Sequence, residues 1–264
     1  MENVTFIRLS VFLGLFALLA SVEALAPRRV RTQTRKARWV TNWAFTIVNS
    51  MTLNAMAFAL PLLAVGAAID AQTQGWGVFN ALSWPTWVEV VLVILILDFA
   101  IWTQHLITHK VPFLWRMHQV HHADVDIDVT TAIRFHPAEI ALSMILKIGL
   151  VYLLGAAALA IILFEVILNG TAIFNHANIR LPLIVDAVVR RLIVTPDMHR
   201  VHHSVLRHEH DSNYGFSLSI WDQMFGTYIA QPEAGHDGMD IGLRWQDNRP
   251  SRLGWSLKLP FTNK

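Results

Sequence analysis

Thirteen histidines are present in this chain, and eight of them form three tight sets at fixed spacings. The sets are HxxxH at His105 and His109, HxxHH at His118, His121 and His122, and HxxHH at His199, His202 and His203. Spacings of three and four residues return to one face of a helix, so each set predicts imidazoles that point in one direction. Random placement of histidine at this frequency would produce HxxHH roughly 0.03 times in a chain of this length.

Imidazole nitrogen is a good ligand for iron, zinc and copper. Eight such nitrogens exceed what one ion accepts, so the sets predict a pair of metal ions, an arrangement that many enzymes use. The chain contains no cysteine, and carboxylates are sparse within the sets, so the predicted site is built almost entirely from nitrogen. An isolated histidine is more often a polar surface residue than a ligand. His208, His210 and His236 lie outside the spacing, and we expect them on a solvated surface.

Acidic residues near the sets have two possible roles. Asp98 lies in an apolar segment, seven residues before His105 and on nearly the same helix face. It is expected either to accept a hydrogen bond from a ligand imidazole or to lie at a membrane interface. Asp124, Asp126 and Asp128 alternate after the second set, a pattern that favours a solvated loop over metal ligation.

Composition indicates a membrane protein. Of the 264 residues, 54% are hydrophobic and 15% are charged, and the mean hydropathy is +0.42. Ordinary soluble domains carry about 25% charged residues. Lysine and arginine total 21 against 19 aspartate and glutamate, and no basic stripe interleaved with aromatic residues is present. This balance argues against a nucleic-acid partner.

Four apolar segments cover the first two thirds of the chain, at residues 9–26, 43–69, 86–102 and 138–168. A membrane-spanning helix needs about 20 apolar residues, so the first three segments predict one span each. The fourth is long for one span and short for two. Gly149 and Gly155 would allow it to bend, which favours a hairpin of shortened helices.

The first segment could alternatively be a signal peptide, because small residues at positions 24–26 resemble a cleavage site. Pro27 follows directly, and six basic residues lie between Arg28 and Arg38. Such a basic stretch resists export and marks the cytoplasmic side, so an uncleaved span is favoured. The three histidine sets must meet on one side of the membrane, which requires the fourth segment to cross an even number of times or not to cross fully.

These patterns predict an all-α integral membrane bundle with a cytoplasmic, histidine-rich helical cap. Residues 1–264 are expected to form a single domain, with membrane helices over about 9–168 and the histidine region over about 98–228. The three sets and the C-terminus are expected on the cytoplasmic side of a bacterial inner membrane or of the endoplasmic reticulum.

The region from about residue 90 to 230 resembles the fatty acid hydroxylase and sterol desaturase superfamily of integral membrane di-iron enzymes. The stretches that carry the resemblance are residues 97–122, RFHP at 134–137, FNHAN at 174–178, TPDMHRVHHS at 195–204 and DSNYGFSLSIWDQMFGTY at 211–228. The resemblance implies metal ligation by the three sets and by His176. His136 is a further candidate ligand, or else a structural histidine.

Arg180 stands near the place where some members have another ligand histidine, so a tenth ligand stays open. Asn178 and Tyr214 are candidates for polar contacts beside the ligands. The resemblance further implies two iron ions, which zinc can replace in purified protein, and O₂ as co-substrate. The implied reaction is hydroxylation or desaturation of a lipid, whether a fatty acyl chain, a sterol or another isoprenoid.

A separate electron-transfer partner is expected, either cytochrome b5-like or a ferredoxin with its reductase, because 264 residues leave no room for a haem or flavin domain beside the core. Other lipid oxidations on this scaffold stay open, including ether cleavage, aldehyde removal and carotenoid oxidation. A non-enzymatic membrane metal carrier is less favoured, because its ligands should be spread along several spans. A zinc hydrolase is disfavoured, because the chain contains no HExxH motif.

Overall fold

A computed structural model describes residues 2–59, 63–82, 85–245 and 247–262. The described residues form helices and loops without a named strand, and only three isolated β-bridges join the loops. The all-α prediction is therefore confirmed. The five long helices are α1 (Glu2–Leu25), α2 (Arg35–Ala59), α5 (Thr86–Lys110), α7 (Pro137–Leu154) and α8 (Ala158–His176).

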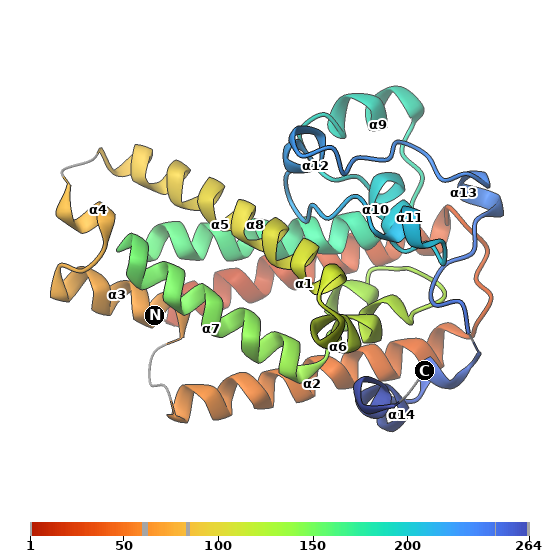
Figure 1. Ribbon diagram of the computed structural model, residues 1–264, viewed down its shortest axis with the longest axis horizontal. Helices are drawn as coiled ribbons and strands as arrows, with labels where there is room; N and C mark the ends of the chain where they lie inside the picture. The colour runs from red at the N-terminus through yellow and green to blue at the C-terminus, as the bar shows by residue number, and fades with distance from the viewer. Residues whose placement is uncertain (1, 60–62, 83–84, 246, 263–264) are drawn as a thin grey trace.

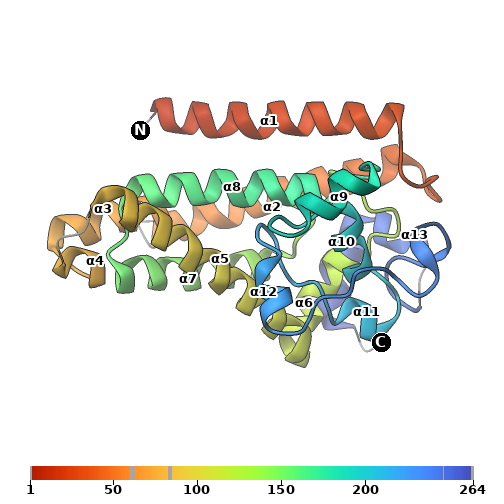
Figure 2. The same cartoon turned by 90° about the horizontal axis from the view of Figure 1, so that it is seen from above.

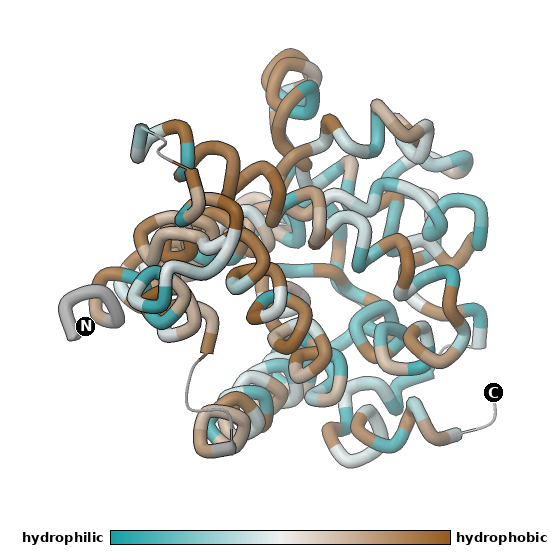
Figure 3. Tube along the Cα trace, turned by 60° about the vertical axis from the view of Figure 1, so that its left-hand side comes forward, coloured by the Kyte–Doolittle hydropathy of each residue, from teal (hydrophilic) through white to brown (hydrophobic). Residues whose placement is uncertain are grey.

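These five helices lie side by side along the long axis of the molecule, and the chain reverses direction from one to the next (Figures 1 and 2). The short helices α3 (Ala64–Gln74) and α4 (Val78–Ala81) lie at one end of the bundle, near the N-terminus. The basic segment at residues 28–38 and a cap of short helices lie at the other end. Hydrophobic residues predominate along the long helices, and hydrophilic residues are more frequent in the cap (Figure 3).

Four described helices are long and apolar enough to cross a membrane: Phe6–Leu25 of α1, α5, α7 and α8. The last two form the hairpin that the fourth apolar segment predicted. The chain reverses at Gly155, whose φ of 66° is left-handed and therefore favours glycine. A Cβ at Gly155 would lie 2.3 Å from the carbonyl oxygen of Trp76, so the α3–α4 connection packs directly against the turn.

The prediction of one span over residues 43–69 is wrong. Within this range, residues 43–59 belong to α2 and residues 64–69 belong to α3, and α2 is not among the four apolar candidates. The physical reason is that α2 turns polar side chains toward the protein. Asn42 Nδ2 donates to Asp124 and Thr130, and Asn49 Nδ2 donates to the carbonyl oxygen of Phe135. Pro61, inside the predicted span, lies outside the described residues.

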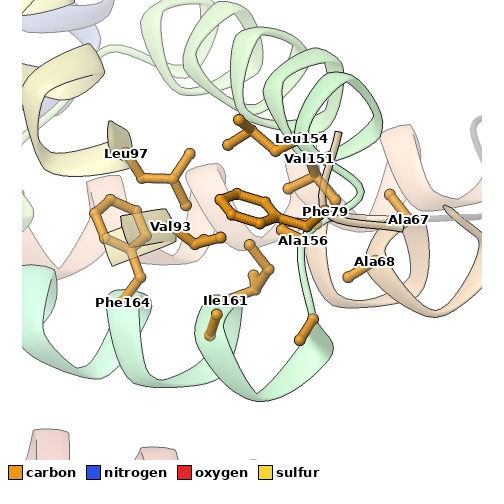
Figure 4. Packing of buried hydrophobic residues seen from close by; sticks show 13 residues of the cluster. Ala67, Ala68, Phe79, Val93, Leu97, Val151, Leu154, Ala156, Ile161 and Phe164 are labelled. Atoms are coloured by element: carbon orange, nitrogen blue, oxygen red, sulfur yellow. The ribbon is translucent and has the colours of Figure 1, made fainter. Parts of the chain in front are cut away.

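The main apolar core lies where α3, α4, α5, α7 and α8 converge (Figure 4). Val93 and Leu97 of α5 meet Ile161 and Phe164 of α8, while Phe79 of α4 packs among them. This core fixes the spacing of α5 and α8. Both helices carry histidines at their C-terminal ends, away from this core. It therefore holds the helices that must bring those histidines together.

The cap follows α8 and also includes α6, which connects α5 to α7. Its helices are α6 (Pro112–His122), α9 (Leu183–Val189), α10 (Pro196–His202), α11 (Arg207–His210), α12 (Ile220–Met224), α13 (Gly235–Gly238) and α14 (Leu253–Lys258), with 3₁₀ turns at Thr131–Ile133, Arg249–Ser251 and Leu259–Phe261. The basic segment binds to the cap. Arg28 forms an ion pair with Asp237, and Arg29 donates to the carbonyl oxygens of His236 and Met239.

The three acids after the second histidine set, Asp124, Asp126 and Asp128, are buried, so the prediction that they form a solvated loop is wrong. Arg38 of α2 binds Asp124 and Asp128, both at 2.6 Å, and Asp126 accepts hydrogen bonds from the backbone of Thr32 and Gln33. Burial opposes ionisation of Asp124, but the Arg38 charge beside it outweighs this and lowers its pKa to about 2. The three acids thus tie the loop behind the second set to the start of α2.

Candidate metal centre

Local structure places each histidine set at a helix end. His105 and His109 lie in the last two turns of α5, and the second set occupies the C-terminal half of α6, which begins with Pro112 in its first turn. The third set lies on and just after α10. There Thr195 caps the helix by accepting a hydrogen bond from the Met198 N–H, and Pro196 follows in the first turn. His176 is the last residue of α8.

The structure brings nine predicted ligands together in two groups. Within each group, one ring nitrogen per histidine lies within 4.8 Å of those of its neighbours. One group contains His105, His109, His118, His122 and His202, and the other contains His121, His176, His199 and His203. The second and third sets each contribute to both groups, so each group requires both of these sets.

Distances between imidazoles in each group suit a shared ion. The Nε2 atoms of His105 and His118 are 3.0 Å apart, and His176 Nε2 lies 3.1 Å from Nε2 of both His121 and His199. Two nitrogens that each lie about 2.0–2.1 Å from one metal, at a right angle, are separated by about 3 Å. These nitrogens are therefore close enough to coordinate one ion in each group.

Hydrogen bonds at Nδ1 orient five of the nine rings. His105 donates to the carbonyl oxygen of Tyr214 at 2.7 Å, and His118 donates to Glu139 Oε1 at 2.6 Å. His121, His176 and His202 donate in the same way to the carbonyl oxygens of Arg134, Ala172 and Ser212. A proton held at Nδ1 leaves the Nε2 lone pair free, which is how proteins prepare histidine for a metal.

The other four rings have no hydrogen bond at Nδ1, and in three of them Nε2 is unpaired as well. Both ring nitrogens of His109, His122 and His203 are buried without a hydrogen bond. Buried polar groups are normally paired, and leaving one unpaired costs free energy. A metal ion in each group would satisfy one nitrogen of each ring, so the donor set fits the two ions that the sequence predicted.

The charge state of the cap histidines also suits metal binding. Burial lowers the pKa of His121, His122, His199, His202 and His203 well below the ordinary value, and the neighbouring imidazoles lower it further. A proton on one ring would repel a proton on the next. These side chains are therefore neutral near pH 7, which is the form that binds a metal.

Asp98 does not bind a ligand imidazole, contrary to one of its two predicted roles. It accepts hydrogen bonds from Trp221 Nε1 at 2.8 Å and from the backbone of Leu218, while both nitrogens of His105 have other partners. Its carboxylate joins α5 to the cap near α12. The carboxylate is buried within the protein.

The remaining candidates lie beside the centre rather than within it. His136 caps α7, because its Nδ1 accepts from Ala138 N and its Nε2 donates to the Leu257 carbonyl oxygen, which corresponds to the structural alternative. Asn178 exchanges hydrogen bonds with the backbone of Arg29 and joins the end of α8 to the basic segment. Tyr214 contacts the His109 ring at 5.2 Å and binds His105 through its backbone carbonyl.

The three histidines expected on a solvated surface differ from one another. His208 is exposed and pairs with Glu233, as predicted. His236 is buried 3.6 Å from Asp197, so its prediction is wrong. His210 is half-buried and stacks on Trp115 at 5.3 Å, and together with Asp211 it lies close to His109.

Glu139 was missed by the sequence analysis, although it holds His118. It occupies the first turn of α7, directly after RFHP, and begins an otherwise apolar helix. An acid at the start of such a helix was the available signal. A cavity of about 330 Å³ in the cap reaches His109 and is lined in part by Trp115, His210 and Arg244.

Comparison with known proteins extends these observations. The chain is 28% identical to an ornithine lipid hydroxylase, OlsE, of Rhizobium tropici over 236 residues, which are 88% of this chain and 70% of that protein. It is 30% identical to the human alkylglycerol monooxygenase over 168 residues, which cover 61% of this chain but only 35% of that protein. No solved structure matches the chain.

The region that contains every histidine of the two groups also matches a family model. The model of the fatty acid hydroxylase family matches residues 90–227, just over half of the chain. Those residues begin in α5 and end after α12, so they include both the hairpin and the third histidine set. The chain therefore belongs to the fatty acid hydroxylase family.

Proposed function

We propose that this protein is a membrane-bound, O₂-dependent lipid hydroxylase with two iron ions. The observation that carries the proposal is the packing of nine buried histidines into two groups. The group around His105 would hold one ion, and the group around His176 would hold the other. Iron bound there would supply the redox chemistry by which O₂ is reduced and an unactivated C–H bond is oxidised.

The protein's own residues orient and shield this centre. Glu139 and the backbone carbonyls that hold the Nδ1 protons fix the tautomers, so the Nε2 atoms point inward. The rings of Phe135 and Phe216 pack against His121 at 4.4 Å and His105 at 4.8 Å. These rings give the centre an apolar wall that excludes water, beside which a hydrocarbon segment would lie.

We infer that the substrate is an amphipathic lipid that reaches the centre from the bilayer. The centre lies at the ends of α5 and α8, two of the helices suited to cross a membrane. Hydroxylation is favoured over desaturation because the relatives are named a lipid hydroxylase and a monooxygenase. The similarity along most of the chain favours a lipid with a polar head group, as in the ornithine lipid hydroxylase.

Oxidation of a glyceryl ether lipid is a second candidate. The alkylglycerol monooxygenases of human and Xenopus tropicalis are each 30% identical to this chain over the matched region. Because the chain spans about a third of their length, this candidate rests on the catalytic region alone. In both candidates, electrons come from a separate donor, either a cytochrome b5-like protein or a ferredoxin with its reductase.

Lipid profiling of a host that expresses the wild-type chain or His203→Ala tests the function. Cells grown under isotopically labelled O₂ should contain a lipid with one labelled oxygen atom only when the wild-type chain is present. A lipid that instead loses two hydrogens would show desaturation. Wild-type and variant profiles that are identical, with the iron-loaded protein and a donor present, would overturn the proposal.

Metal analysis of the purified protein tests the centre separately. Iron-replete, anaerobic preparation should give two metal ions per chain. Zinc in the same positions would stand in for iron, since imidazole sites accept both metals. One ion or none per chain would contradict the two-group interpretation of the histidines.

A further inference from the structure

The side chains of α9 are arranged in the reverse of the usual order for a surface helix: charged side chains face the protein and apolar side chains face outward. The residues that face the protein are Asp186 and Arg190, which form an ion pair. The residues that face outward are apolar. Together with Leu192 after α9 and two residues at the end of α12, they form the α9–α12 patch. It consists of Leu183, Ile184, Val188, Leu192, Met224 and Phe225, each 52% to 83% exposed.

The patch belongs to the rigid part of the cap. Ser219 Oγ donates to the Arg190 carbonyl oxygen at 2.7 Å, and Gln223 Nε2 donates to the same oxygen at 3.3 Å. Ile193 and Leu218 form an antiparallel bridge directly beyond. The apolar side chains are therefore presented by fixed backbone. Contiguous apolar surface of this kind marks a contact with a protein or a membrane.

The patch is continuous with a helix that is suited to cross the membrane. Phe225 stacks on Phe99 at 5.7 Å and on Trp102 at 4.9 Å, and Trp221 packs on Phe99 at 5.0 Å. Phe99 and Trp102 belong to α5, and α9 lies at the outer edge of the cap beyond this part of α5 (Figure 1). In Figure 3, α9 is the topmost segment and is coloured hydrophobic along most of its length.

Charges flank the patch at both ends of α9. Arg180 precedes the helix and lies 3.7 Å from Asp237, and Arg191 follows the helix; both arginines are exposed. An apolar helix face bordered by arginines is typical of helices that lie in the membrane interface, where guanidinium groups reach lipid phosphates. The charges therefore match an anionic lipid surface, and the aromatic side chains match the interfacial aromatic belt.

We propose that the α9–α12 patch inserts into the interface of the bilayer that α5 crosses. Arg180 and Arg191 then contact lipid phosphates. Ile193, which forms the bridge, lies four residues after α9, and Thr195 caps the helix of the third histidine set two residues further on. Bilayer contact at α9 thus fixes the depth of the third set relative to the first set on α5. This inference does not depend on the reaction.

Single-cysteine labelling tests the contact cleanly, because the natural chain contains no cysteine. Ile184→Cys and Val188→Cys report on the patch. Ile145→Cys, exposed on α7, is the membrane control, and Glu233→Cys, exposed on the cap, is the aqueous control. Each variant carries an environment-sensitive fluorophore and is reconstituted in vesicles of phosphatidylcholine and phosphatidylglycerol. Quenching is measured with nitroxide lipids and with iodide.

Labels at positions 184 and 188 should be quenched by nitroxide lipids several-fold more strongly than the label at 233, as the label at 145 is. Iodide should show the reverse order. If the labels at 184 and 188 are quenched by nitroxide lipids and by iodide to the same extent as the label at 233, the proposal is overturned. Labels shielded from both quenchers would also overturn it, because they would indicate a second copy of the chain on the patch.

Two further measurements address the lipid contact. A photoactivatable lipid added to the unmodified protein should cross-link within residues 183–192, and labelling of the 233 region alone would contradict the inference. Arg191→Gln should raise the iodide quenching of the label at 184 in vesicles that contain phosphatidylglycerol. Unchanged quenching would remove the arginine from the proposed contact.

Discussion

At the scale of single residues, the two nitrogens of each ring have different tasks. In His105 and His118 the Nδ1 proton is held by Tyr214 and Glu139, while the Nε2 atoms approach each other at 3.0 Å. A ring with a fixed tautomer offers a lone pair in one direction only. Substitution of the ring and substitution of its partner should therefore have different consequences.

Replacing a histidine of the groups removes a ligand. His122→Ala and His203→Ala should each abolish lipid oxidation and lower the metal content, while the protein still inserts into the membrane. Insertion depends on the apolar helices, which carry neither residue. The measurement is product formed and metal bound per amount of membrane-inserted protein, with an electron donor supplied. The control is His208→Ala, an exposed residue outside the groups, whose turnover should stay near normal.

Replacing Glu139 with glutamine leaves all nine histidines in place but exchanges the charged acceptor of the His118 Nδ1 proton for a weaker, neutral one. Glu139→Gln should lower metal affinity or activity about 10–100-fold, because partners of ligand histidines typically contribute this much. Titration of the apoprotein with Fe²⁺ and turnover at saturating iron separate the two effects. Glu233→Gln, at an exposed position, serves as the control. Wild-type affinity and turnover in Glu139→Gln would show that the 2.6 Å contact has no positioning role.

Histidine spacing predicted every member of the two groups except His176, which came from the family resemblance. It did not predict the partners of Nδ1. Most are backbone carbonyls, such as those of Tyr214 and Arg134, and a carbonyl leaves no mark on residue identity. Asp98 shows the reverse case. Its spacing from His105 was suitable, but indole and amide donors of the cap reach its carboxylate instead.

At the scale of elements, the α7–α8 hairpin delivers His176 to the centre. Two features favour glycine at position 155 in this turn. Its φ is left-handed, and a side chain there would meet the Trp76 carbonyl oxygen. Apolar length and glycine content predicted this hairpin. They did not predict the division of residues 43–69, because the partners of Asn42 and Asn49 lie about 80 to 90 residues away.

Gly155→Ala should destabilise the protein, since a non-glycine residue at positive φ costs about 1–3 kcal/mol and the new methyl group would meet backbone. Gly149→Ala is the matched control. Its Cβ would meet nothing within 4 Å, and alanine within a helix is favoured by about 1 kcal/mol over glycine. Thermal unfolding in detergent should show a lower Tm for the first variant and an unchanged or higher Tm for the second. Equal Tm values would show that the turn tolerates a side chain.

At the scale of the whole molecule, the basic segment, the metal centre and the C-terminal helix α14 lie at the same end of the bundle (Figure 1). The basic segment at residues 28–38 contacts the loop behind the second set through Arg38, and it contacts the cap through Arg28 and Arg29. Positive residues beside membrane helices mark the cytoplasmic side. The whole assembly of basic segment, metal centre and C-terminus is therefore expected to face the cytoplasm.

Reporter fusions after Lys36 and after Lys264 should both report a cytoplasmic location. Between these positions α2, α5, α7 and α8 alternate in direction along the bundle, so the basic segment and α14 lie at the same end (Figure 1). An alkaline phosphatase and a fluorescent protein, used as paired reporters, give opposite signals on the two sides. Reports from opposite sides would contradict the arrangement, and two external reports would reverse the orientation.

The sharing of histidine sets between the two groups determines when each group can become complete during synthesis on the ribosome. His105 and His203 are separated by about a hundred residues, which take about 5–20 s to synthesise. Both groups draw on the third set, so neither is complete until α7 and α8 have been made. Metal loading is then the last event of maturation, and a truncated or stalled chain would enter the membrane without a competent centre to reduce O₂.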